Sequence, residues 1–184
     1  GFSSITENIG EVENQGFEIG ISTKNLVGKF EWNTQLNISA NRNKVLKLYN
    51  DQPIDDIGRG GNRVMVGQPV GIFYDFEWLG IDPSTGDVVY ADLNHDEKIT
   101  TEDRTIVGTP HPDFIGGITN TFTYKGFDLS VLIQFSYGND VFHGSRLFLE
   151  SLQGGDNQLE AVTRRWRNVG DITDIPRATS DAVK

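Results

Sequence analysis

Apolar and polar residues alternate along several long segments of this chain. The alternation runs through residues 30–40 and 127–137, where Leu132 is its one breach in the second segment, and it recurs at 17–23 and 118–124. A period of two residues predicts β-strands with one apolar and one polar face. The two longer segments have about eleven residues each, whereas strands of soluble proteins usually have roughly five or six. We therefore expect a mainly β protein with unusually long strands.

Short links join these segments in pairs. Lys125-Gly126 is typical of a two-residue hairpin turn, in which Gly supplies a positive φ. The link at 25–28 joins the first two segments in a similar way. We predict two antiparallel hairpins, and long polar stretches separate them. The predicted pairs are strands 17–24 with 30–40 and strands 116–124 with 127–137.

The length and the two-sided pattern of these strands favour a transmembrane β-barrel. A tilted strand needs roughly 9–11 residues to cross a bilayer, with apolar side chains toward lipid and polar ones toward a wet lumen. Short turns at one end and long loops at the other are also typical of outer-membrane barrels. A soluble β-sandwich, whose strands alternate in the same way, is the alternative.

The segment 141–168 lacks this alternation and is predicted to be a helical excursion within a long loop. One short helix is expected from 141 to about 152, and a second over 159–167 with Asp156-Asn157 as its cap region. The second helix would place Leu159, Val162 and Trp166 on one face and Arg164, Arg165 and Arg167 on the other. These arginines fit either a solvated face, which we favour, or a grip on an anionic ligand.

Residues 92–103 form the most distinctive motif of the chain. Oxygen-bearing side chains fall at positions 1, 3, 5, 9 and 12 of this loop, which is the ligand spacing of EF-hand-type calcium loops. Ca²⁺ is a hard cation that takes roughly six to eight oxygen ligands. The predicted ligands are the side chains of Asp92, Asn94, Asp96, Thr100 and Asp103 and the main-chain carbonyl of Lys98.

Two departures from the calcium-loop pattern predict a modest affinity. Position 6, usually Gly, is Glu97, which must adopt a positive φ at a cost of about 1–2 kcal/mol. Position 12 is Asp103 rather than the longer Glu, and the flanks carry no clear helices, because Val88-Val89-Tyr90 predicts a short strand. The alternative is a polar turn rich in Asp and Asn that binds no metal. Aromatic residues at 73–78 fit packing in a core or membrane belt, which we favour, or stacking on sugar rings.

Composition narrows the function classes. The 184 residues carry a formal net charge of −10, which argues against binding nucleic acid or anionic lipid headgroups through basic patches. The absence of Cys excludes disulfides, zinc–thiolate sites and a thiol nucleophile. No apolar run approaches the length of a transmembrane helix. With no initiator Met and no signal-peptide pattern, the chain is expected to be a piece of something longer.

The sequence does not predict an enzyme. His95, His111 and His143 are scattered, and no Ser-His-Asp or metalloprotease spacing occurs. A glycoside hydrolase with paired carboxylates is the enzyme alternative. The acidic residues, however, gather in the loop 92–103 or at turns such as 82–87. We therefore set this alternative aside.

Four groups of runs follow one another along the chain. They are Asn8-Ile9-Gly10-Glu11-Val12-Glu13-Asn14-Gln15-Gly16-Phe17-Glu18, Gly67-Gln68-Pro69-Val70-Gly71-Ile72-Phe73-Tyr74, Tyr90-Ala91-Asp92-Leu93-Asn94-His95-Asp96 with Ile99-Thr100 and Asp103-Arg104, and Pro112, Gly116-Gly117, Asn120 and Tyr124-Lys125-Gly126-Phe127-Asp128-Leu129-Ser130. These runs resemble the SusC/RagA-type TonB-linked, or TonB-dependent, outer-membrane transporters. The resemblance covers most of residues 8–140, and the order and spacing of the runs are more specific than any single run. It departs from the family at His95 and Glu97, where the family tends to have Gly, and at Asp75.

The resemblance implies a barrel of about 22 strands with an N-terminal plug, in the outer membrane of a Gram-negative bacterium. Such proteins import oligosaccharides or peptides with energy from the TonB complex, and a SusD-like surface lipoprotein caps the barrel. Residues 1–184 would form part of the C-terminal barrel region, with calcium stiffening the loop 92–103. As an isolated piece they would have open strand edges, which predicts self-association and either a partial barrel or a sandwich-like form. The alternative is a secreted calcium-stabilised β-sandwich that binds carbohydrate.

Overall fold

A computed structural model describes residues 10–55, 61–152 and 157–178. Asn8, Ile9 and Asp156, which the sequence analysis used, lie outside these described residues. The chain divides into two compact units. In the described residues the sheet unit comprises 10–55, 62–72 and 108–141, and the loop unit comprises 61, 73–107, 142–152 and 157–178.

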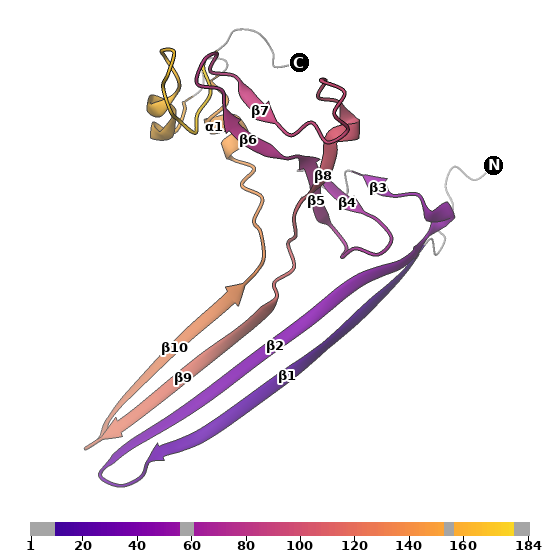
Figure 1. The fold of residues 1–184 in the computed structure, drawn as a ribbon. Coiled ribbons are helices and arrows are strands. Elements are labelled where there is room, and N and C mark those ends of the chain that lie inside the picture. Colours follow the sequence, from indigo (N-terminus) through magenta and orange to yellow (C-terminus); the bar gives the residue numbers. More distant parts are fainter. Residues whose placement is uncertain (1–9, 56–60, 153–156, 179–184) are drawn as a thin grey trace, which may run out of the picture. The chain divides into compact units, whose positions relative to one another are not determined.

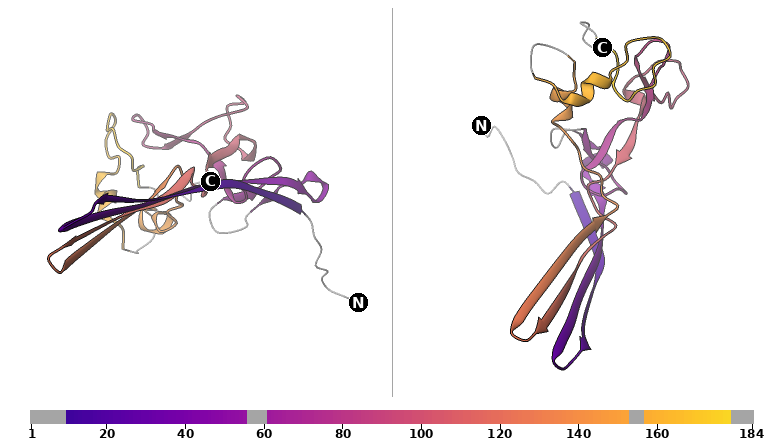
Figure 2. Two further views of the ribbon diagram at one scale, coloured as in Figure 1. Left: turned by 90° about the horizontal axis from the view of Figure 1, so that it is seen from below. Right: turned by 90° about the vertical axis from the view of Figure 1, so that its left-hand side faces the viewer.

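The sheet unit is built on four long antiparallel strands. They are β1 (Gly10–Leu26), β2 (Phe30–Leu48), β9 (Phe114–Tyr124) and β10 (Phe127–Tyr137). Their order is β1-β2-β9-β10, so that two strands far apart in the sequence, β2 and β9, lie side by side in the middle (Figures 1 and 2). Both predicted hairpins are confirmed, although β1 and β2 extend well beyond the predicted ends.

The pairing register places like residues on the same face of all four strands. Ile19 pairs with Ile38 and Leu36 pairs with Ile118, which in turn pairs with Ile133. On the opposite face Asn37 lies between Gly20 and Gly117. Since side chains alternate between faces along a strand, these pairs extend over the whole sheet as one apolar and one polar face. The predicted alternation is therefore confirmed in three dimensions.

The β9–β10 hairpin closes through the predicted two-residue turn. Lys125 has φ 49° and Gly126 has φ 83°, which corresponds to a turn of the I′ kind that matches the twist of the flanking strands. The β1–β2 hairpin closes through residues 27–29, next to an irregularity in β1 between Lys24 and Leu26. Both short turns lie at the same end of the sheet (Figure 1).

The sheet unit buries only a small apolar core. Val45 and Leu48, at the far end of β2, pack with Val64 and are joined by the half-buried Ile54 and Val70. Two short strands, β3 (Ile54–Asp55) and β4 (Asn62–Val64), pair here beside the 3₁₀ turn η1 (Tyr49–Asp51). Most of the apolar face of the long strands is exposed, with Phe17 at 58% and Leu129 at 59%.

The loop unit has short strands and short helical turns. Most of β5 (Ile72–Phe76) and β8 (Arg104–Gly108) lies in it, and these two strands are neighbours. A second pair is formed by β6 (Trp78–Ile81) and β7 (Val88–Tyr90). The 3₁₀ turn η2 (Thr101–Asp103) precedes β8.

The helical excursion is shorter than the sequence pattern suggested. It contains α1 (Arg146–Leu149) and the 3₁₀ turn η3 (Glu160–Arg164) in the described part of 141–168. The helix expected over 159–167 ends at Arg164, because Arg165 returns to an extended ψ of 152°. Trp166 therefore does not share a helical face with Leu159 and Val162. No helix among the described residues is both long and apolar enough to span a membrane.

A polar network crosses the apolar face of the sheet at Asn120. The Oδ1 of Asn120 accepts hydrogen bonds from Trp32 Nε1 at 2.9 Å and from Thr34 Oγ1 at 2.7 Å. Thr34 Oγ1 also accepts from Asn25 Nδ2 at 2.6 Å. Asn120 and Thr34 are paired across β9 and β2, so the network ties the two central strands together on that face.

Replacing Asn120 by Leu should destabilise the sheet. The indole N–H of Trp32 and the hydroxyl of Thr34 would lose their common acceptor, and an unmet hydrogen-bonding group typically costs about 1–3 kcal/mol. We expect the free energy of unfolding in denaturant to fall by that amount. The control is Thr121→Val on the opposite face, because Thr121 makes no side-chain hydrogen bond to another described residue. An Asn120→Leu variant as stable as this control would contradict the prediction.

Candidate functional site

The apolar face of the sheet carries two bands of aromatic rings. Near the turns, Phe122 stacks against Phe30 and Trp32 with ring centroids 6.2 and 5.9 Å apart, and Phe30 lies 6.3 Å from Tyr124. At the other end of β9, Phe114 lies 6.2 Å from Phe135 and 5.2 Å from Tyr137, which are both in β10. The face between the bands is mainly aliphatic, with Ile19, Ile38, Leu36, Ile118 and Ile133.

The spacing of these bands matches the apolar layer of a bilayer. Phe114 and Tyr124 are ten residues apart in β9, which corresponds to about 34 Å along the strand. A strand tilt of roughly 35–45° reduces the height to about 25 Å, the usual height of the apolar band in membrane barrels. Aromatic girdles at both borders are the further mark of that band.

The opposite face of the sheet is polar and largely uncharged over its middle. Ser22 pairs with Gln35, which in turn pairs with Thr119. Asn37 lies between two glycines on the neighbouring strands. Amide and hydroxyl groups of this kind are suited to contact with water or with polar ligands rather than with lipid. The outer edges of β1 and β10 have no partner strand among the described residues.

The loop 92–103 is organised by its own acidic side chains. Asp92 accepts hydrogen bonds through Oδ1 from the N–H of His95 at 2.7 Å and through Oδ2 from the N–H of Glu97 at 2.8 Å. Asp96 Oδ1 accepts from the N–H of Lys98 at 2.8 Å. His95 and Glu97 have φ values of 61° and 65°, so the predicted positive φ of Glu97 is confirmed.

The buried side chain of Asp103 links the beginning of the loop to its end through hydrogen bonds. Its side chain is 0% exposed, and its Oδ1 accepts from the N–H of Leu93 at 2.9 Å. Its Oδ2 accepts from the N–H of Thr100 at 2.8 Å, and the hydroxyl of Thr100 accepts from Glu102, so that Thr100 and Asp103 form a reciprocal cap of η2. Hydrogen bonding from the Thr100 N–H, with further bonds from Leu93 and Asn94, lowers the pKa of Asp103 below its ordinary value of 3.8.

The six predicted ligands all lie in the described part of the chain. Within the described residues, no group of three or more His, Cys, Asp or Glu side chains is placed to hold a metal ion. The carboxylates of Asp92, Asp96 and Asp103 accept hydrogen bonds from main-chain N–H groups, which stabilise the turn. A carboxylate oxygen has two lone pairs and can coordinate a cation as well as accept a hydrogen bond, and oxygen atoms are the ligands that Ca²⁺ prefers. Calcium binding by this loop stays a prediction.

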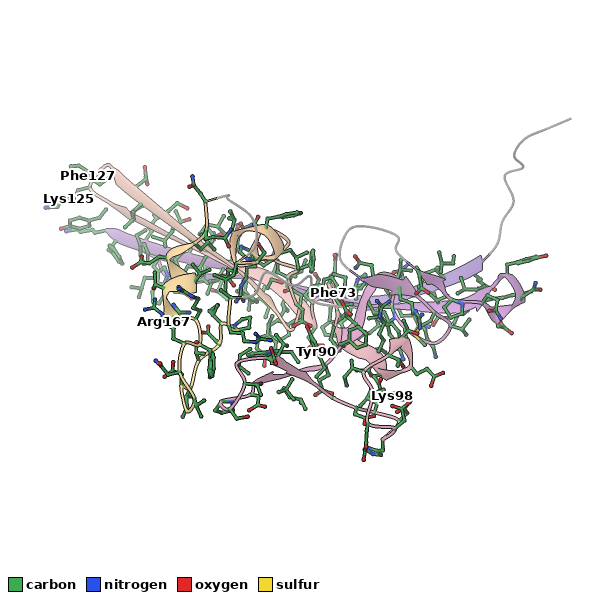
Figure 3. All side chains as sticks on the ribbon, turned by 90° about the horizontal axis from the view of Figure 1, so that it is seen from above. Phe73, Tyr90, Lys98, Lys125, Phe127 and Arg167 are labelled. Atoms are coloured by element: carbon green, nitrogen blue, oxygen red, sulfur yellow. The ribbon has the colours of Figure 1, made fainter. Side chains whose placement is uncertain are left out.

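Two of the aromatic residues at 73–78 pack within the loop unit. Phe76 lies 5.5 Å from Tyr90, and the guanidinium of Arg104 sits over the Phe76 ring at 5.2 Å from its centroid. Phe73 lies 6.3 Å from Phe142 (Figure 3 labels Phe73 and Tyr90). Phe73 and Phe76 are therefore engaged in packing, as the favoured interpretation expects, whereas Trp78 is 53% exposed.

Trp166 connects the C-terminal part of the loop unit to the turn between β6 and β7 through a hydrogen bond and ring packing. Its Nε1 donates to the carbonyl of Pro83 at 3.0 Å, and a side chain on Gly86 would collide with its ring, because a Cβ there would lie 2.5 Å from it. Ile175, 2% exposed, and Arg177, which pairs with Asp87 at 2.7 Å, complete the contact. The pattern analysis missed this role because it placed Trp166 on a helix.

The arginines of this segment are engaged separately. Arg164 forms an ion pair with Asp174 at 3.0 Å, and Arg167 donates to the carbonyl of Thr163 at 3.2 Å. His111 likewise has a local partner, since its Nε2 lies 2.8 Å from the carbonyl oxygen of Val70 in the sheet unit. These contacts give Arg164, Arg167 and His111 structural roles.

Relatives of known name support one family. TonB-dependent receptor P26 of Formosa agariphila is 34% identical over 203 residues, covering 100% of this chain and 20% of that protein. TonB-dependent receptor P3 of the same organism is 32% identical and covers 96% of this chain. TonB-dependent receptor SusC of Bacteroides thetaiotaomicron is 31% identical over 155 residues, covering 77% of this chain and 15% of that protein. These relatives are named as receptors, not as enzymes.

Solved structures support the same fold. The structure of the RagAB peptide transporter is similar with a TM-score of 0.79 and 21% identity, covering 96% of this chain and 21% of that chain. The RagAB peptide importer in its closed-closed state gives a TM-score of 0.77. No family model matches. This chain spans about a fifth of the length of the relatives P26 and P3. Together with the two-faced sheet, these similarities show that the chain belongs to the SusC/RagA-type TonB-dependent receptors.

Proposed function

We propose that this chain forms part of the barrel wall and extracellular loops of a nutrient transporter in the outer membrane of a Gram-negative bacterium. The observation that carries the proposal is the sheet with one apolar face, two aromatic bands and one polar face. The apolar face would meet lipid and the polar face would line the lumen. The loop unit consists of residues from the long segment between β2 and β9 and from the segment after β10, and it contains neither of the short turns. It would lie on the cell surface.

The family suggests the cargo and the partners of the complete receptor. We propose uptake of oligosaccharides or peptides, driven by the TonB complex and assisted by a SusD-like surface lipoprotein. The uncharged amides and hydroxyls on the polar face suit either cargo, because both are rich in hydrogen-bonding groups. The packed rings and turns of the loop unit would give such a partner a preformed surface, which lowers the entropy lost on docking.

The secreted β-sandwich is not favoured. A sandwich buries the apolar face of one sheet against a second sheet. In the described residues the apolar face of β1, β2, β9 and β10 stays largely exposed, and the unit's buried core is confined to the far end of β2. An exposed apolar face of this size needs lipid or another protein to cover it.

A matched pair of neighbouring residues tests the orientation of the sheet. Ile133 lies on the apolar face and Gln134 on the polar face, near the middle of β10. In the complete receptor, Ile133→Lys should lower the free energy of unfolding in lipid by about 2–4 kcal/mol, whereas Gln134→Lys should have little effect. Urea titration in liposomes measures both. Equal effects of the two substitutions would contradict the proposed orientation of the sheet.

Labelling on intact cells tests the placement of the loops. We expect a cysteine at position 98 in the Asp-rich loop (Lys98→Cys) to react with a membrane-impermeant maleimide on intact cells. A cysteine at position 27 in the β1–β2 turn (Val27→Cys) should react only after the outer membrane is permeabilised, because short turns face the periplasm. Both variants are made in a cysteine-free receptor. Labelling of both positions on intact cells would exclude the proposed topology.

We further propose that the loop 92–103 binds calcium with a dissociation constant of about 10⁻⁴–10⁻³ M, the range of weak extracellular sites. Isothermal titration of the chelator-treated receptor should show this binding. Asp96→Asn should weaken it, because the amide keeps the bond from the Lys98 N–H but removes the charge. Asp171→Asn, in a capped turn outside the loop, is the control. Absence of binding, or equal binding in the two variants, would leave the loop as a metal-free turn.

A further inference from the structure

The polar face of the sheet is hollowed at its centre. This polar hollow has a volume of about 870 Å³, which lies within the roughly 300–1,000 Å³ of ligand pockets. Residues from the polar face of all four long strands line it, whereas Ile118 and Ile133, in the middle of the apolar face, do not. Its uncharged polar side chains are those of Ser22, Gln35, Asn37, Ser39, Thr119 and Gln134.

Two glycines leave space around Asn37 in the hollow. Asn37 in β2 is paired with Gly20 of β1 and with Gly117 of β9, so no side chain stands directly on either side of its amide. A Cβ at Gly20 would meet no atom within 4 Å. The exposed amide of Asn37 therefore has room for a ligand beside it.

The polar side chains of the hollow keep their hydrogen-bonding capacity. None of the six uncharged ones makes a side-chain hydrogen bond to another described residue. Farther along the same face of β2, by contrast, Asn41 and Asn43 both donate to Oδ1 of Asn14, at 3.3 and 2.9 Å. Amides and hydroxyls each contain a donor and an acceptor. The hollow therefore gathers groups that can both donate to a ligand and accept from it.

Two apolar side chains interrupt the polar face at the same place. Leu132 is the breach in the alternation of 127–137, and its pairing with Thr119 places it on the polar face. Ile115, which is paired with Ser39, lies on that face as well. Both side chains line the hollow, and they are 59% and 47% exposed. The hollow thus offers apolar contact area next to its hydrogen-bonding groups.

A neutral oligosaccharide has the chemistry that suits this lining. Each sugar hydroxyl both donates and accepts, as the amides and hydroxyls of the hollow do, and the C–H groups of a sugar ring form an apolar surface between its hydroxyls. A peptide has N–H groups that only donate and carbonyls that only accept, and its end carries a carboxylate. Among the described residues that line the hollow only Glu18 is charged, so a carboxylate would meet repulsion and no cation.

We propose that the polar hollow is a binding subsite for an uncharged oligosaccharide. The amides of Gln35, Asn37 and Gln134 exchange hydrogen bonds with sugar hydroxyls. Leu132 and Ile115 contact the C–H surfaces of the rings. The proposal rests on the proposed function, in which this face lines the lumen, and it narrows the cargo from oligosaccharides or peptides to neutral oligosaccharides.

Capture by the complete receptor tests the class of ligand. The purified receptor is applied to immobilised oligosaccharides cut from neutral glucans, mannans, xylans and galactans. Acidic oligosaccharides cut from alginate and pectin, and short peptides, are immobilised alongside. We expect capture by at least one of the neutral oligosaccharides. Capture by peptides alone, by acidic oligosaccharides alone, or by no ligand of the three classes would overturn the proposal.

Substitutions in the hollow test the subsite itself. The ligand is a neutral oligosaccharide that captures the unmodified receptor, and its affinity is measured by isothermal titration. Asn37→Ala and Gln134→Ala should each weaken the affinity several-fold, since one hydrogen bond to an uncharged group is worth about two- to tenfold. Leu132→Ser should weaken it too, because apolar contact is lost. Folding of each variant is checked by the heat-dependent mobility of the barrel on gels.

Asn33→Ala is the matched control. Asn33 lies on the same face of β2, paired with Lys24, and is not part of the lining of the hollow. The affinity of this variant should equal that of the unmodified receptor. Unchanged affinity in Asn37→Ala and Gln134→Ala, or an equal loss in Asn33→Ala, would overturn the subsite. Neither result bears on the membrane placement of the sheet, which the labelling of positions 27 and 98 tests separately.

Discussion

The register between β2 and β9 is the constraint on which the rest of the sheet depends. It sets Leu36 opposite Ile118 and Trp32 opposite Phe122, so that the apolar faces of two separate hairpins become one. A slip by one residue would turn every side chain of one hairpin to the wrong face. The Asn120 acceptor and the aromatic band near the turns exist only in this register.

A sheet with two such faces and so little buried core needs two different surroundings. The apolar face lacks protein cover over most of its length, and the polar face presents amides and hydroxyls that would be costly to leave in lipid. A barrel wall satisfies both demands, because lipid covers one face and water or cargo meets the other. The aromatic bands would then mark the two borders of the apolar layer. The edges of β1 and β10 would be completed by neighbouring strands of the same wall.

The short-range sequence pattern was sufficient to predict each hairpin, but not the pairing between the two hairpins. Alternation and the Lys125-Gly126 turn predicted strands and pairing within each hairpin, since both signals are contained in a few consecutive residues. The pairing of β2 with β9 spans the connection between residues 48 and 114, and no short-range signal marks it. Asn120 was noted only as part of a motif, and its role as acceptor for Trp32 depends on that long-range register. The helix expected over 159–167 failed for a related reason: Trp166 is held by Pro83 and Gly86, and these tertiary contacts outweigh helical periodicity.

The acidic residues show why net charge was a weak guide to partners. Asp82, Asp103 and Asp171 each accept hydrogen bonds that build turns of the loop unit. Bonds from Ser84, from the Thr100 N–H and from the Asn168 N–H lower the pKa of the three side chains, respectively, so each is held as an anion by its own turn. Much of the negative charge in this unit is therefore committed to local structure.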